Sequence, residues 1–192
     1  MRPRWYALVI DLRETPARLL TSTVSLLVFS VPVQAQCVFA PSIGDDDFVC
    51  ASSTSVGGLA DLVGNNSLTF PAGGNGTLAG NVIFGPGVDV IEMHSGSITG
   101  TVDQGDGADS FLISSGSVGG NVQQGGGIDN FRMTGGIVQS LNQGDSLDDF
   151  FMSDGRIIDA FDDGDRATMT GGRIGRVNMK LDDNVFDMSG GV

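Results

Sequence analysis

The segment GDGADSFLISSGSVGGNVQQ (residues 105–124) is followed without a gap by GGGIDNFRMTGGIVQSLNQ (residues 125–143), which repeats its pattern. Related units start at Asn65 in degenerate form, at Gly85, at Gly144, at Gly164 in shortened form, and at Leu181 as a partial unit. The array therefore covers residues 65–192 with a period close to 20 residues. A unit this short cannot bury its own apolar face, so the units must stack as the coils of a solenoid.

Apolar residues recur at four positions of the unit. The first column contains Ile91, Phe111, Phe131, Phe150, Ala167 and Phe186, and the second contains Met93, Ile113, Met133, Met152, Met169 and Met188. The third contains Leu78, Ile98, Val118, Ile137, Ile157 and Ile174, and the fourth contains Val82, Val102, Val122, Leu141, Phe161 and Val177. The first two columns are two residues apart, which is the spacing of side chains on one face of a strand. Gly-rich turns on both sides of this pair would interrupt a helix. We predict an all-β solenoid, of the β-helix or β-roll type, with coils of about 20 residues.

The N-terminal segment has the features of a secretory signal peptide. Its basic region contains Arg2, Arg4, Arg13 and Arg18. An apolar stretch at 19–31 follows, and Val33-Gln34-Ala35 forms a small-residue cleavage site. At about 1.5 Å per residue the apolar stretch would cover only ~20 Å of a ~30 Å hydrocarbon core, so a transmembrane anchor is the weaker interpretation. We predict that residues 1–35 are removed and that the mature chain starts at Gln36, which places the protein outside the cytoplasm.

Two cysteines follow the predicted cleavage site. In an exported protein Cys37 and Cys50 are expected to form one disulfide that closes a short loop. The loop lacks a CxxC motif and a nearby His, which argues against a metal or redox role. We predict that residues 36–64 form a disulfide-stapled cap on the first coil. The last coil has no such cover in the sequence, and we expect the natural protein to continue beyond Val192.

The charge of the chain excludes some partners. Four of the ten basic residues and two of the 23 acidic residues lie in the leader, which leaves six basic and 21 acidic residues in the mature chain. Nucleic acids and anionic membranes need a positive field, so neither is an expected partner.

An acidic column precedes the first apolar column. Its members are Asp89, Asp109, Asp129, Asp148 and Asp165, with Asn184 in the last unit. Stacking would bring these carboxylates about one strand spacing apart, where like charges repel. Either the turn spreads them into solvent or a cation lies between them.

The turn segments QGDGADSF (from Gln104) and QGGGIDNF (from Gln124) resemble the calcium-binding nonapeptide of RTX proteins. This resemblance implies a calcium site with Asp106, Asp109 and Asp129 as ligands. The carbonyl groups that it implies as further ligands are those of Gly105, Gly107, Gly125 and Gly127. The sequence departs from the family pattern because Gln replaces the first Gly and the second half of each coil lacks Asp. The alternative interpretation is that Asp and Gly serve only as turn residues.

The mature chain as a whole resembles the passenger domains of type V autotransporters of Gram-negative bacteria. The resemblance rests on the leader and on Gly/Asp/Ser/Thr repeats with turns such as 134–136 and 170–172. It implies an outer-membrane or cell-surface location, or secretion, and a translocator barrel that this sequence does not contain. It also implies an unknown extracellular or host-surface ligand.

No catalytic constellation emerges from the residues. The single histidine, His94, occupies a position that holds Ser or Thr in other units, and no GxSxG motif occurs. The regular recurrence of the acids favours a scaffold role over a catalytic pair. We expect a structural or adhesive module without catalytic activity or catalytic residues. The alternatives are an RTX-like calcium-binding secreted module and a fragment of a polysaccharide-active β-helix enzyme.

Overall fold

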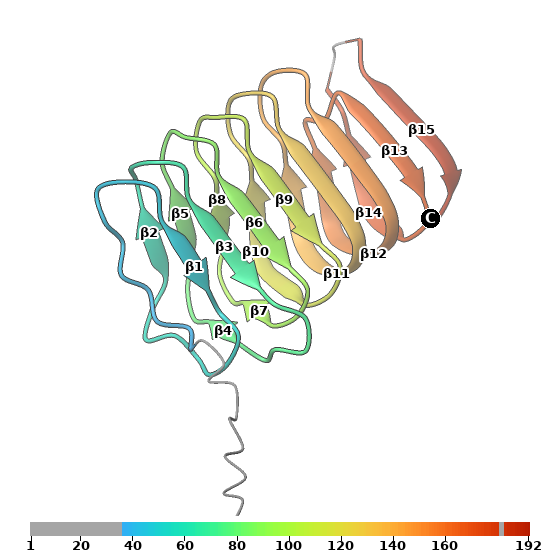
Figure 1. Cartoon of the computed structure of the whole chain (residues 1–192). Coiled ribbons are helices and arrows are strands. Elements are labelled where there is room, and N and C mark those ends of the chain that lie inside the picture. Colours follow the sequence, from blue (N-terminus) through green and yellow to red (C-terminus); the bar gives the residue numbers. More distant parts are fainter. Residues whose placement is uncertain (1–35, 181–182) are drawn as a thin grey trace, which may run out of the picture. The chain divides into compact units, whose positions relative to one another are not determined.

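The computed structural model describes residues 36–180 and 183–192. The predicted signal peptide, residues 1–35, lies outside the described residues. The described chain is an all-β solenoid in which every strand pairing is parallel, as the repeat predicts (Figure 1). It contains no helix, and therefore none long and apolar enough to span a membrane.

The strands stack in two main ladders. The first ladder contains β1 (Asp47–Val49), β3 (Ser67–Phe70), β6 (Val90–Met93), β9 (Ser110–Ile113), β11 (Asn130–Asn142), β12 (Asp149–Asp162), β13 (Arg166–Thr170) and β15 (Val185–Gly190). The second contains β2 (Leu59–Asp61), β5 (Val82–Phe84), β8 (Val102–Asp103), β10 (Ser117–Gln123), β11, β12 and β14 (Arg173–Asn178). The short strands β4 (Thr77–Leu78) and β7 (Ser97–Ile98) form a third ladder that joins β10. β11 and β12 are long enough to take part in both main ladders.

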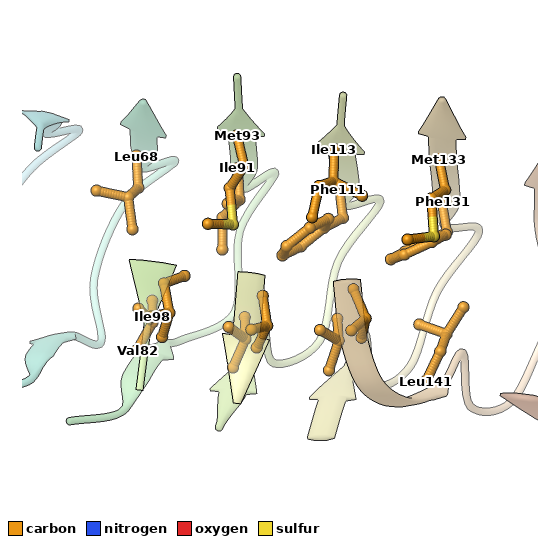
Figure 2. Packing of buried hydrophobic residues seen from close by; sticks show 14 of the residues in the cluster. Leu68, Val82, Ile91, Met93, Ile98, Phe111, Ile113, Phe131, Met133 and Leu141 are labelled. Atoms are coloured by element: carbon orange, nitrogen blue, oxygen red, sulfur yellow. The ribbon is translucent and has the colours of Figure 1, made fainter. Parts of the chain in front are cut away.

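The predicted columns form most of the core of this stack, but their members Val177 and Met188 in the last units are 39% and 48% exposed. In the first ladder Ile91, Phe111, Phe131, Phe150, Ala167 and Phe186 lie in register, and so do the residues of the second column. Figure 2 shows Ile91, Phe111 and Phe131 of the first column on the side of the interior opposite Val82, Ile98 and Leu141. Phe111, Phe131 and Phe150 form parallel ring stacks with centroids 5.4 and 5.8 Å apart. The residues between the columns point outward, as period-two alternation requires. Each coil thereby buries the apolar face of its neighbour.

One member of the third column was predicted wrongly. Val118 pairs with Val138 and not with Ile137; Val138 is fully buried, whereas 44% of Ile137 is exposed. The unit 125–143 is one residue shorter than its neighbours, and the missing residue falls after Val138, before Leu141. Counting from the preceding Gly-Gly turn would have shown the correct register.

The segment 36–64, predicted as a cap, is itself a coil. Its strands β1 and β2 pair with β3 and β5, so the ladders begin before residue 65. Residues 36–39 cover the open face of this coil. The N–H of Cys37 donates to the carbonyl of Ser52, and the ring of Phe39 packs edge-on against Phe48 with centroids 5.8 Å apart.

Candidate functional site

Four aspartates form a buried column beside the Gly-rich turns. We call Asp89, Asp109, Asp129 and Asp148 the Asp ladder. Their exposed fractions are 0, 2, 1 and 0%. Each lies two residues before the inward side chain of the first column, and the same alternation turns it into the core. Of the two alternatives drawn from the sequence, the one in which the turn spreads the carboxylates into solvent is therefore wrong for these four residues.

The ladder is held by hydrogen bonds between coils. In each coil Oδ1 of the aspartate accepts the backbone N–H of the equivalent residue in the preceding coil. The donor and acceptor pairs are Asn66 to Asp89 at 2.6 Å, Asp89 to Asp109 at 2.7 Å, Asp109 to Asp129 at 2.8 Å and Asp129 to Asp148 at 2.8 Å. The series continues from the N–H of Asp148 to Oδ2 of Asp165 at 3.0 Å. These bonds fix the register of neighbouring coils at the point where each strand of the first ladder begins.

The second oxygen of each ladder carboxyl group has no such partner. Oδ2 of all four residues is buried and has no hydrogen-bond partner among the described residues. An ionised carboxylate is stable in the interior only when its oxygens are paired. Burial accordingly raises the pKa of Asp89 to about 6, raises those of Asp109 and Asp148 to about 7, and raises the pKa of Asp129.

A second polar column lies at the other end of the same turns. We call Gln104, Gln124 and Gln143 the Gln ladder; all three are fully buried. Nε2 of Gln124 donates to Oε1 of Gln104 at 3.3 Å, and Nε2 of Gln143 donates to Oε1 of Gln124 at 3.1 Å. Each Nε2 also donates across its own turn to a carbonyl six residues later, at 3.2 or 3.3 Å. The Gln ladder therefore closes each turn and links it to the preceding one.

The glycines of these turns allow backbones to touch. A Cβ on Gly125 would lie 1.7 Å from the carbonyl oxygen of Gly105, and a Cβ on Gly127 would lie 1.5 Å from that of Gly107. The carbonyl of Gly105 also accepts the N–H of Gly126 at 3.3 Å. Close stacking of the turns thus explains the glycines without a ligand.

The structure separates the three predicted calcium ligands. Asp109 and Asp129 are successive members of the Asp ladder, whereas Asp106 is exposed in the turn. Of the predicted carbonyl ligands, those of Gly105, Gly107 and Gly125 face a glycine of the next coil. In residues 36–180 and 183–192, no group of three or more His, Cys, Asp or Glu side chains is placed to hold a metal ion.

The remaining polar features lie at the surface or at the first coil. Cys37 and Cys50 form a disulfide that ties the segment 36–39 to the first coil, with Cα atoms 4.2 Å apart. The Nδ1 atom of His94 lies 2.8 Å from Oγ of Ser114, so a surface hydroxyl is its partner. A surface hollow of about 470 Å³ opens on the outward side of β12, β13 and β15. Its single ion pair joins Arg166 and Asp149 at 3.0 Å.

Sequence reasoning missed the Gln ladder. Gln104 and Gln124 were noted only as departures from the RTX pattern. The signal was present, because each Gln follows an inward residue of the fourth column by two positions. Alternation places such a residue inside, and a buried amide must find partners.

The comparisons with known proteins identify no relative. No family model, no curated protein and no solved structure matches the sequence.

Proposed function

We propose that the chain is an exported, non-catalytic rod that serves a structural or adhesive role at the surface of a Gram-negative bacterium or in its surroundings. The observation that carries this proposal is the contrast between the two sides of each strand. The inward residues are alike from coil to coil. The outward residues between the first two columns differ in every coil: Glu92, Leu112, Arg132, Phe151, Thr168 and Asp187.

Such a contrast suits a scaffold that presents a varied face. A catalytic pair is needed once, whereas the buried acids and amides here recur in successive coils and hold the backbone. The outward face offers charged, apolar and aromatic groups side by side; the guanidinium of Arg132, for example, lies 4.3 Å over the ring centre of Phe151. An extracellular or host-surface ligand is the partner that this face would meet.

Export is supported by the N-terminal part of the chain. The predicted leader at 1–35 precedes a disulfide, and disulfides persist in oxidising compartments. The resemblance to autotransporter passengers adds the proposal that a translocator barrel delivers the rod to the surface.

Export can be tested with the full chain in a Gram-negative host. We expect N-terminal sequencing to find Gln36 as the first residue, and Cys37 and Cys50 to react with maleimide only after reduction. An unprocessed chain with two reactive thiols would contradict export.

Adhesion can be tested with beads coated with the full chain. They should be retained on matrix-coated or cell-coated surfaces, and a variant with Glu92, Leu112 and Arg132 changed to Ser should be retained less. Equal retention of both proteins would contradict an adhesive role of this face. Circular dichroism of the variant checks that the rod is intact.

A calcium-binding module is the second candidate. The observation that favours it is the set of unpartnered Oδ2 atoms in the Asp ladder. Asp109 and Asp129 would each offer one oxygen, whereas the exposed Asp106 would have to move to join them. Calcium binding predicts that EDTA lowers the melting temperature of the chain at pH 7; an unchanged melting temperature would exclude this candidate.

A further inference from the structure

We propose that the Asp ladder is a proton-binding column, so that the solenoid is most stable in acidic surroundings and loosens when the column ionises. The argument rests on the placement of four carboxyl groups in successive coils. Each has one oxygen that accepts a backbone N–H and one buried oxygen without a donor. This pattern fits a neutral carboxylic acid better than a carboxylate, because its carbonyl oxygen accepts one hydrogen bond and its hydroxyl is an uncharged donor and not a charged acceptor. The inference does not depend on the proposed function.

The equivalent position in the preceding coil already holds a neutral residue. Asn66 is 1% exposed; its Oδ1 accepts the N–H of Asp46 at 3.2 Å, and its own N–H donates to Asp89. The Nδ2 group of Asn66 donates to the carbonyl of Val63 at 3.5 Å. A planar group with one acceptor oxygen and one hydrogen-bearing atom therefore fits this position of the coil, and a protonated aspartate has the same form.

Within residues 36–180 and 183–192, no positive charge is placed to neutralise the column. Besides the other ladder members, the charged groups that act on it are all acidic: Asp61, Asp106, Asp163 and Asp165. Three described cations in the coils that follow Asp148 are paired with other acids. Arg166 pairs with Asp149, Arg176 with Asp162 and Lys180 with Asp163. Ionisation would thus create stacked like charges about one strand spacing, ~4.8 Å, apart.

The direction of the pH effect follows from linkage. The pKa of Asp89 rises from an ordinary value of 3.8 to about 6, and those of Asp109 and Asp148 rise to about 7, chiefly because of burial. Between the ordinary pKa of 3.8 and the raised pKa values of about 6 to 7, the folded chain binds more protons than the unfolded chain, so its stability falls as the pH rises. The stabilisation that the protonated Asp ladder contributes is complete below about pH 4 and is lost as the pH passes through 6 to 7.

The experiment measures unfolding of the full chain in urea, with EDTA present, at intervals from pH 4.5 to pH 8. We expect the unfolding constant to rise by up to about tenfold per pH unit for each carboxyl group that titrates. The double variant Asp109→Asn/Asp129→Asn should have a clearly shallower pH dependence, because two titrating groups are gone and the amides keep the acceptor oxygen. Asn66→Asp should steepen it by adding a fifth titrating group to the column.

The matched control is Asp187→Asn, the same substitution at an exposed outward position. It should leave the pH dependence of the wild type unchanged. A wild type whose stability does not change between pH 4.5 and pH 8, or a double variant with the wild-type slope, would overturn the proposal.

Infrared spectroscopy gives a measurement that does not depend on refolding. The carbonyl stretch of a protonated carboxylic acid should be visible in the folded wild type at pH 5.5 and disappear towards pH 8. If this band is already absent at pH 5.5, the column is ionised and the proposal is wrong. The same holds if millimolar calcium removes the pH dependence of the wild type but not that of the double variant, since a metal would then be the ligand of the column.

Discussion

Two corners of each coil respond differently to changes in chain length. The corner between the Gln and Asp positions, which we call the ladder turn, keeps a spacing of five residues in successive coils: Asp61 to Asn66, Phe84 to Asp89, Gln104 to Asp109, Gln124 to Asp129 and Gln143 to Asp148. The corner between the third and fourth columns, which we call the free corner, does not keep its length. It takes four residues from Val118 to Val122 and three from Val138 to Leu141.

The difference follows from what crosses each corner. At the ladder turns that start at Gln104, Gln124 and Gln143, a buried carboxyl group and a buried amide both bond to backbone groups, and both lose partners if the turn changes length. At the free corner the register shifts lie between Val118 and Asn121 and between Val138 and Leu141. The paired residues on both sides stay in register.

The one shortened ladder turn fits this interpretation. In the unit after β12 the turn takes two residues, from Asp163 to Asp165. There the Gln ladder has ended. The next coil has no Gln to donate to Gln143, whose Oε1 is buried without a partner. The shortened turn thus occurs in a coil without the amide, although the turns that start at Asp61 and Phe84 keep five residues without a Gln.

Deleting one residue at each corner of the same coil should give the largest difference in stability between the two corners. Deletion of Ala108 shortens a ladder turn and moves Asp109 out of register, which should lower the free energy of unfolding by about 3 kcal/mol or more. Deletion of Gly119 shortens the free corner to the length seen after Val138, and it should cost about 1 kcal/mol or less. Urea unfolding followed by circular dichroism measures both. Equal losses would show that the ladder turn has no special constraint.

Gly127→Ala tests the close approach of stacked ladder turns. The new Cβ would lie 1.5 Å from the Gly107 carbonyl oxygen, at a backbone φ of 136° that L-residues rarely adopt. We expect a loss of about 2–4 kcal/mol in unfolding free energy. Gly126→Ala is the control, because its Cβ would meet only the Asp106 side chain, at 3.2 Å. If both variants unfold at the same urea concentration, turn contact is not what requires Gly127.

Gln124→Leu removes the middle member of the Gln ladder at nearly constant size. Nε2 of Gln143 loses one of its two acceptors, and the carbonyl of Asn130 loses the Nε2 donor. Unfolding free energy should fall by about 2–3 kcal/mol, as for other buried groups left unpaired. The neighbouring Gln123 is exposed, and Gln123→Leu should change stability by no more than ~0.5 kcal/mol. A loss of the same size in both variants would refute a structural role of the ladder.

The sequence predicts the apolar part of this fold better than the polar part. Period-two alternation and the 20-residue repeat were sufficient for the Phe and Met columns, because apolar side chains have only one stable place in a stacked coil. The same alternation places Asp109 and Gln124 inside, but buried acids and amides are uncommon and their partners are backbone groups in another coil. Which N–H meets which oxygen depends on the register between coils, and this register is known only once the strands are paired.

Substitutions at Ile137 and Val138 test the position of the missing residue at the free corner, with the smallest expected effect. If the missing residue of this unit falls after Val138, then Val138 faces the core and Ile137 faces outward. Val138→Thr would bury a hydroxyl group in place of a methyl group and should cost about 1–2 kcal/mol in unfolding free energy. Ile137→Thr should change it by no more than ~0.5 kcal/mol, since that position is solvated. If Ile137→Thr costs more than Val138→Thr, the missing residue lies before Val138. The free corner would then have the same length in this coil as in the coil before it.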